Sequence, residues 1–423
     1  MKSLRDKFKK HIANDGPEVT IAMIIKKLRL TLIGKIIPHK HANLANYKYP
    51  WELYTTSEKL DRICKSPKKK KIVYIFPERD YATVRYRAYN MQQILNKTEL
   101  YYAEIFFENE LSTITSEIIS NVDLVILVRT FWTQKIENII GLAIKKEIPV
   151  IYDIDDLVFI PDAVPTIANH LNYRETPRLV DLAGKTLLNR IIMQRVGGFI
   201  TTNQFLQNII NAHFPGKPCY VIPNFLNDEQ VLCSKEIIDA DKINHQPFKI
   251  GYFSGSSTHQ NDFDLIANQL VKLLENNPDI ELKIVGDLNI SRQFEPVINQ
   301  LTITGLKNYL QLQKEIASVD INLVPLVYNE FNNCKSELKF FEAGIVRVPT
   351  IASPNYSYRN AIQNGENGFL AGSANDWSDL ILNLKSDKSL YQTISENAYQ
   401  SSINKYHKNR EEIILPIIKS IIK

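Results

Sequence analysis

The sequence has little cysteine, with four residues in 423, widely scattered and without a CxxC pair. A disulfide framework or a structural zinc site needs closely spaced cysteines, so this scarcity argues against both and favours a reducing cytoplasm. No run of about 18 apolar residues occurs, so no membrane-spanning helix is expected. The N-terminus also lacks a signal-peptide pattern, because Lys26, Lys27 and Arg29 interrupt its apolar stretch.

Several catalytic and binding signatures are absent as well. The sequence has neither the full GxxxxGK[ST] pattern of a phosphate-binding loop nor a GxGxxG turn. No Ser-His-Asp or Cys-His order points to a nucleophilic hydrolase. The basic segments contain no nucleic-acid-binding motif, so we expect no nucleic acid partner.

Positive charge is concentrated at one end of the chain. The formal net charge is +5, yet residues 1–50 alone hold eleven Lys or Arg against three acids. Apolar residues recur there at helical spacing, with the basic residues mostly on the other side. Such a helix can lie on an anionic membrane, and we expect this contact through residues 1–40. The alternative is a helix that packs on its own domain or on a partner.

From residue 72 onward, short β-rich apolar runs alternate with segments of helical length. The first series includes KIVYIF, YAEIFFE, VDLVILV and IPVIYDID, and the second includes FKIGYFSG, IELKIVGD, INLVPL and VPTIAS. Strands that alternate with helices predict parallel, doubly wound sheets. The polar stretch at residues 227–246 separates the two series and is the expected linker.

We therefore expect an α/β protein with two doubly wound domains, at residues 51–238 and 239–400. A basic helical extension over residues 1–50 precedes them, and a C-terminal helix over residues 401–423 is expected to return to the first domain. Ligands of such sheets bind outside the carboxyl ends of the strands. A cleft between the two domains is thus the expected site.

The second domain opens with a loop of small residues. An apolar strand runs into the sequence SGSST at residues 254–258, and a helix should follow. Small residues allow the backbone to approach a ligand, and a helix N-terminus favours an anion. We expect a phosphate group to contact Gly255, Ser256, Thr258 and His259, although an ordinary strand-to-helix turn would look similar.

The stretch NNCKSELKFFEAGIVRVPTIAS places three charged side chains on one face of an expected helix over residues 335–346. The first free N–H groups of that helix, with Lys335 and Ser336, would make a cradle for phosphate. Glu342 could accept hydrogen bonds from a diol such as a ribose, and Lys339 lies between the two. The alternative is a solvated, salt-bridged helix face.

The first domain contributes two charged stretches at the carboxyl ends of its strands. In VIYDIDDLVF, Asp153 and Asp156 could orient acceptor hydroxyl groups, although strand-end caps would look alike. We expect no metal ion at this acidic stretch. Arg85 and Arg87 follow the first strand and suit phosphate or carboxylate, with a basic helix face as the alternative.

Taken in order, these stretches resemble the GT-B-fold glycosyltransferases, most closely glycosyltransferase family 4, over roughly residues 72–405. The most specific part is FFEAGIVRVPTIAS followed by NGENGFL, which is similar to an ordered series of motifs in that family. The resemblance implies two Rossmann-like domains that face each other across a cleft. It also implies a hexosyltransferase-type reaction that retains anomeric configuration and needs no metal or other cofactor.

The resemblance further implies a nucleotide-sugar donor on the second domain and a glycan or lipid-linked acceptor on the first. The ribose-contacting glutamate of the family corresponds to Glu342, and its phosphate loop to residues 254–259. We accordingly expect donor binding by the loop, Lys335, Ser336, Lys339 and Glu342. Acceptor binding is expected from Arg85, Arg87, Asp153 and Asp156, and catalytic roles from Glu342, Lys335, Asp153 and Asp156.

This sequence departs from the family pattern at two places. Cys334 stands where the family often has an earlier glutamate, and the usual Arg and Lys pair after the first strand of the second domain is missing. Lys335, Lys339 or Arg85 could supply the missing positive charge. The expected setting is bacterial surface polysaccharide synthesis at the inner face of the cytoplasmic membrane. A nucleotide-sugar epimerase or a non-catalytic sugar-nucleotide-binding protein remain the alternatives.

Overall fold

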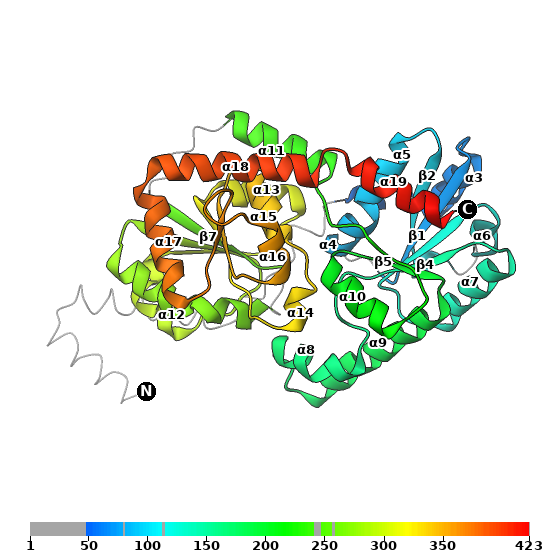
Figure 1. The fold of residues 1–423 in the computed structure, drawn as a ribbon, viewed down its shortest axis with the longest axis horizontal. Coiled ribbons are helices and arrows are strands. Elements are labelled where there is room, and N and C mark those ends of the chain that lie inside the picture. The colour runs from blue at the N-terminus through cyan, green and yellow to red at the C-terminus, as the bar shows by residue number, and fades with distance from the viewer. Residues whose placement is uncertain (1–47, 79–80, 112–114, 241–246, 256–258, 423) are drawn as a thin grey trace, which may run out of the picture.

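The structure is a computed structural model that describes residues 48–78, 81–111, 115–240, 247–255 and 259–422. Two α/β lobes lie side by side, and the C-terminal helices run along one and then onto the other (Figure 1). The expected fold of two doubly wound domains is confirmed. The predicted basic helix at residues 1–50 lies almost wholly outside the described residues.

The first domain is built on a six-stranded, fully parallel sheet with strand order β2-β1-β3-β4-β5-β6. Its inner strands are rich in Val and Ile and are buried along nearly their whole length, because helices cover both faces. The strands are β1 (Lys70–Phe76), β2 (Tyr101–Phe107), β3 (Leu124–Val128), β4 (Val150–Asp153), β5 (Gly198–Thr201) and β6 (Cys219–Val221). The main helices are α3 (Thr56–Lys65), α5 (Asn90–Lys97), α6 (Thr115–Ser120), α7 (Gln134–Lys145), α8 (Val164–His170), α9 (Thr176–Arg195) and α10 (Gln204–His213).

The second domain repeats this plan with strand order β12-β11-β10-β7-β8-β9, again fully parallel. Its strands are β7 (Phe248–Phe253), β8 (Ile280–Val285), β9 (Leu301–Thr304), β10 (Ile321–Val324), β11 (Thr350–Ala352) and β12 (Phe369–Leu370). Its helices include α12 (Gln260–Asn276), α13 (Tyr309–Ala317), α14 (Glu330–Asn333), α15 (Leu338–Gly344), α16 (Tyr356–Ala361) and α17 (Ala374–Ser386).

The chain crosses between the domains twice, and the two crossings lie together. Leu226 in the first crossing donates a backbone hydrogen bond to the carbonyl of Tyr406, at the end of α18 (Lys388–Tyr406), over 2.8 Å. The polar stretch predicted as the linker instead forms α11 (Asp228–Ala240), which packs on α13 of the second domain. The last helix, α19 (Arg410–Ile421), packs on α5 and contributes to the apolar core of the first domain.

The helix predicted over residues 335–346 is shorter than expected. α14 ends at Asn333, a turn spans residues 334–337, and α15 begins only at Leu338. The backbone carbonyls of the turn are used by other elements, because Asn203 donates to the carbonyl of Cys334 over 2.8 Å and the Ser357 hydroxyl donates to that of Lys335. Lys335 and Ser336 therefore precede the helix instead of starting it.

Two glycines are required by close packing near this region. At Gly344, an added Cβ would lie 2.2 Å from the Ser402 hydroxyl oxygen, so α15 approaches α18 more closely than any other residue would allow. Gly286 follows β8 with a φ of +118°, and a Cβ there would lie 1.7 Å from the carbonyl oxygen of Ser254. The carboxyl ends of β7 and β8 are thereby held together beside the small-residue loop.

Candidate active site between the two domains

Polar side chains from both domains meet where the carboxyl ends of the two sheets face each other. Asn261 of α12 donates to the backbone carbonyl of His170 at the end of α8, over 2.9 Å. Asn203, at the start of α10, donates to the Cys334 carbonyl in the turn before α15. Because these contacts join the first domain to the second, the expected cleft is closed by hydrogen bonds in this structure.

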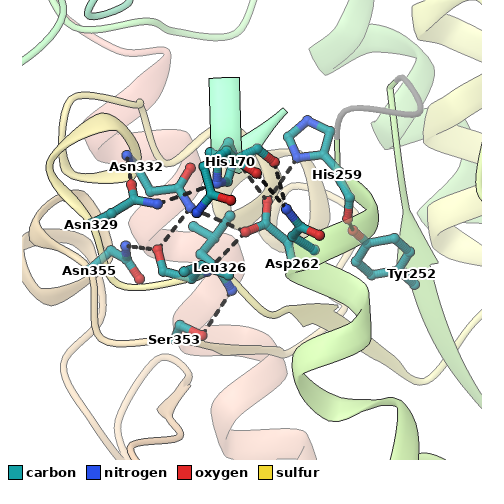
Figure 2. Close-up of polar contacts among 12 residues, drawn as sticks. His170, Tyr252, His259, Asp262, Leu326, Asn329, Asn332, Ser353 and Asn355 are labelled. Carbon is teal, nitrogen blue, oxygen red and sulfur yellow. Dashed lines mark hydrogen bonds and ion pairs between the residues drawn. The ribbon is translucent and has the colours of Figure 1, made fainter. Parts of the chain in front are cut away.

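Asp262 lies at the centre of a polar cluster at this boundary (Figure 2). Its carboxylate is fully buried and accepts hydrogen bonds from the Val327 backbone N–H (2.9 Å), the Asn332 side-chain amide (3.1 Å) and His259 Nδ1 (3.1 Å). Burial by itself would raise the pKa of Asp262, but the hydrogen bond from His259 and nearby positive charge lower this pKa to about 2. The carboxylate is therefore ionised at neutral pH.

Two histidines from different domains flank Asp262. His170 comes from α8 of the first domain, and its Nε2 lies 3.8 Å from the carboxylate, while His259 precedes α12 of the second domain. Burial lowers the pKa of His170, and it lowers the pKa of His259 to about 4 despite the hydrogen bond to Asp262. Both imidazoles are therefore neutral at pH 7. Sequence reasoning placed His259 in the site but missed His170 and Asp262.

Two lysines supply positive charge next to this cluster. Lys339 Nζ is buried without a hydrogen-bond partner in the described part of the chain and lies 5.0 Å from the centre of the Tyr252 ring. Burial lowers the pKa of Lys339 to about 8. Lys335 Nζ lies 4.6 Å from the centre of the Phe331 ring. An ammonium group without an anionic partner is the arrangement expected of a site that receives an anion.

Glu342 is present where the sequence placed it, but side chains of the first domain occupy its carboxylate. Arg85 Nη2 donates to Glu342 Oε1 over 3.0 Å, and the Tyr86 hydroxyl donates to the same oxygen. Arg85 and Glu342 are both buried. Both hydrogen bonds occupy Oε1 of Glu342, and the donor-binding role of Glu342 and the acceptor-binding role of Arg85 stay predictions.

Arg87 and Asp153 pair with each other instead of facing the cleft. The guanidinium donates two hydrogen bonds of 2.8 Å to the carboxylate, a fork that suits the planar geometry of both groups. It also donates to the carbonyl of Ile222 and to the side chain of Asn224 in the first crossing. Both charged side chains are almost fully buried, so neither is free, as placed, to meet an acceptor, and that role stays untested.

Asp155 and Asp156 follow β4 and share one arginine from the neighbouring strand end. Arg129 Nη2 lies 3.2 Å from Asp156, and its Nε lies 3.5 Å from Asp155. Burial, together with the neighbouring carboxylates, raises the pKa of Asp155 to about 6. Asp155 has no role predicted from the sequence, and the acceptor-binding role of Asp156 stays a prediction.

The small-residue loop is only partly described. Gly255 is exposed, and an added Cβ would meet no atom within 4 Å. Ser256 and Thr258 lie outside the described residues, so their predicted phosphate contacts are not addressed. The side chain of Ser336 precedes α15 and donates a long hydrogen bond of 3.4 Å to Glu337. No group of three or more potential metal-ligating side chains occurs in the ranges that the structure describes.

Comparison with known protein families connects the polar cluster to a known domain. Residues 247–387 match the family model for glycosyl transferases group 1. This segment includes Asp262, Lys335, Lys339 and Glu342, so most of the second-domain side of the site lies inside the match. A comparison with curated proteins finds no significant match.

Solved structures resemble most of the chain. HepE of Anabaena, in complex with UDP-glucose, is 15% identical over 83% of this chain and 99% of its own, with a TM-score of 0.54. Sucrose-phosphate synthase of Thermosynechococcus elongatus is 13% identical over 83% of this chain and 98% of its own, with a TM-score of 0.55. TarM of S. aureus, in complex with UDP and α-GlcNAc-glycerol, is 15% identical over 75% and 58%, with a TM-score of 0.51.

Identities this low establish the fold alone. The fold is nonetheless the two-domain arrangement that the sequence predicted. None of the helices in the described ranges combines the length and the hydropathy needed to cross a membrane. The chain thus has the GT-B fold of glycosyltransferases, and its second domain matches the group 1 glycosyl transferase family.

Proposed function

We propose that this chain is a retaining glycosyltransferase that moves a sugar from a nucleotide-sugar donor to a glycan or lipid-linked acceptor. The observation that supports the proposal is the position of Lys339, whose buried ammonium has no hydrogen-bond partner among the described residues and lies within the group 1 match. UDP or UDP-glucose occupies several of the structures that this chain resembles, so a uridine diphosphate sugar is the first donor to test.

The chemistry follows from the charges at the boundary. Transfer breaks the bond between the anomeric carbon and the diphosphate oxygen and forms a bond from that carbon to an acceptor oxygen. Negative charge develops on the departing diphosphate, and Lys335 and Lys339 are placed to stabilise it from the second domain. If the acceptor attacks from the leaving-group side, configuration is retained and the diphosphate oxygen can take the acceptor's proton. Asp156 would then orient the acceptor hydroxyl from the first domain.

The cellular setting is also part of the proposal. Surface polysaccharide synthesis at the inner face of the cytoplasmic membrane is supported by the basic composition of residues 1–40, which lie outside the described structure. Binding to anionic vesicles should disappear when residues 1–40 are deleted. Unchanged vesicle binding by the truncated protein would remove the membrane part of the proposal.

Donor binding is tested first by thermal unfolding with UDP, UDP-glucose, UDP-N-acetylglucosamine and GDP-mannose. A ligand at about one hundred times its Kd should add about 2.7 kcal/mol of stability. Lys335→Ala and Lys339→Met should then lose donor hydrolysis and transfer while remaining folded. Turnover near wild type in both variants would place the donor elsewhere. The proposal also expects full activity after chelation of divalent cations and an α-linked product from an α-linked donor, which NMR of the product resolves.

A further inference from the structure

The hydrogen bonds around Asp262 fix which nitrogen of His259 carries the proton. Asp262 Oδ1 accepts from the Val327 N–H and the Asn332 amide, which leaves Oδ2 to face His259 Nδ1 at 3.1 Å. An ionised carboxylate can only accept hydrogen bonds, so Nδ1 must be the donor. Because the pKa of His259 is lowered to about 4 by burial, the ring holds a single proton at neutral pH. Nε2 therefore presents a lone pair.

His170 of the first domain approaches the same oxygen of Asp262 (Figure 2), and its own hydrogen bond assigns it the opposite tautomer. Asn329 Oδ1 accepts from the backbone N–H of Asn332 over 2.7 Å, which orients the Asn329 amide. Its Nδ2 then faces His170 Nδ1 at 3.3 Å, so Nδ1 accepts and the proton lies on Nε2, toward Asp262 Oδ2 at 3.8 Å. The His259 N–H thus donates to this carboxylate, and His170 Nε2 lies beside it beyond hydrogen-bond distance.

Nε2 of His259 can accept a hydrogen bond but cannot donate one. The described residues give Nε2 no hydrogen-bond partner, and the side chain is 19% exposed. A phosphate oxygen brings only lone pairs at neutral pH and would repel the lone pair of Nε2. A hydroxyl group can donate to it. Lys335 and Lys339, both close enough to lower the pKa of His259 electrostatically, are the groups that suit the diphosphate.

We propose that His259 Nε2 accepts a hydrogen bond from a hydroxyl group of the transferred sugar, so that His259 selects the donor by its sugar and not by its diphosphate. The position agrees with this role, because His259 shares Asp262 with His170 of the first domain. The sugar is the part of a donor that must face the acceptor domain. The proposal rests on the proposed glycosyltransferase function and refines the expectation that residues 254–259 contact phosphate.

Calorimetric titration distinguishes contact of His259 with the sugar from contact with the diphosphate. Wild type, His259→Phe and His259→Gln are each titrated with UDP and with whichever UDP-sugar of the thermal screen binds wild type most tightly. We expect His259→Phe to weaken UDP-sugar binding about tenfold, the value of one hydrogen bond that leaves its partner unpaired, and UDP binding less than about twofold. His259→Gln should recover part of the loss, because its amide oxygen accepts a hydrogen bond.

Each outcome has a distinct meaning. An equal loss for UDP and the UDP-sugar in His259→Phe assigns the residue to the diphosphate and overturns the inference alone. Failure of wild type to bind any nucleotide or nucleotide sugar of the panel overturns the proposed function, and the inference with it. Lys339→Met is the matched comparison, since it should weaken both ligands equally.

A second measurement does not depend on a substitution in His259. Nitrogen-15 NMR of the imidazoles in the wild-type protein reports the tautomer directly. We expect a proton on Nδ1 of His259 and on Nε2 of His170 at pH 7. In Asp262→Asn, an amide N–H facing Nδ1 would move the His259 proton to Nε2, and sugar discrimination should fall as in His259→Phe. A wild-type His259 with its proton on Nε2 would overturn the inference.

Discussion

Lys339 carries a cost in stability that its position in the site explains. Its buried ammonium has no hydrogen-bond partner among the described residues, and burial lowers its pKa to about 8. The unfolded chain holds this proton up to about pH 10.4, so between pH 8 and 10.4 it binds more protons than the folded chain. Wild-type stability should therefore rise with pH through this window. We expect Lys339→Met to stabilise the protein by about 1–2 kcal/mol at pH 7, and the gain to shrink toward pH 10.

Urea unfolding at pH 7, 9 and 10 measures this difference. Lys235→Met is the control, because Lys235 is exposed on α11 and its removal should change stability by less than about 0.5 kcal/mol at each pH. A Lys339→Met protein that is less stable than wild type at pH 7 would show that the ammonium is satisfied in solution.

Unlike Lys339, Asp153 and Arg87 are buried charges that compensate each other. Replacing one partner leaves the other as an unpaired buried charge, so Asp153→Asn should destabilise the protein by about 3–5 kcal/mol. The double variant Asp153→Leu with Arg87→Met should lose less than the single variant, since no buried charge remains. Urea unfolding measures both. Asp61→Asn, in the exposed pair with Lys65, is the control and should cost less than about 1 kcal/mol.

A different result for Asp153→Asn would support the role expected from the sequence. If the variant keeps wild-type stability but loses transfer to the acceptor, then Asp153 acts on substrate. The Arg87 pair would then be a state that opens when acceptor binds.

At the scale of elements, the C-terminal end of α8 is hydrogen-bonded to the second domain. Asn261 of α12 donates to the last two carbonyls of α8, those of Asn169 (3.0 Å) and His170 (2.9 Å). Asn261→Ala should raise amide hydrogen exchange within α8 about fivefold, as expected for a loss of about 1 kcal/mol. Asn276→Ala is the control, because Asn276 donates only within its own helix. Equal exchange in α8 for both variants would show that Asn261 does not hold the element.

The strands were predictable because each is buried on both faces of a parallel sheet. Burial on both faces gives uninterrupted apolar runs, such as VDLVILV for β3, that need no knowledge of distant residues. The helix over residues 335–346 was not predictable in its length. Its first turn is prevented by hydrogen bonds from Asn203 and Ser357, which are far away in sequence. The stretch at residues 227–246, which its polar composition indicated as the linker, contains the helix α11.

The pairings within the site were beyond sequence reasoning for the same reason. Arg87 meets Asp153 across 66 positions, and Arg85 meets Glu342 across 257. Helical or strand periodicity relates residues only a few positions apart. One short-range signal was available, since His259 and Asp262 are three residues apart at a helix start. The donor-binding role of Lys335 and Lys339 stays a prediction, and packing alone shows that the Lys339 ammonium has no hydrogen-bond partner among the described residues.

At the scale of the whole molecule, the two domains are joined at their boundary by the contacts of Arg85 and Tyr86 with Glu342. The two chain crossings meet at Leu226 and Tyr406, and Arg85, Tyr86 and Glu342 join the domains at the boundary. A ligand that needs both oxygens of Glu342 binds only the fraction of molecules in which this contact is open, so its apparent Kd is the intrinsic Kd divided by that open fraction.

Arg85→Gln tests whether this ion pair restrains the molecule. If Glu342 serves the donor ribose, freeing it should tighten UDP-sugar binding about threefold and increase the radius of gyration of the free protein in X-ray scattering. Adding donor should then restore the compact form. Arg62→Gln is the control, because Arg62 pairs with Glu104 within the first domain and loses the same charge away from the boundary. Weaker donor binding in Arg85→Gln, with an unchanged radius of gyration, would instead show that Arg85 contacts the substrate. The domains would then be held together by the polar cluster around Asp262.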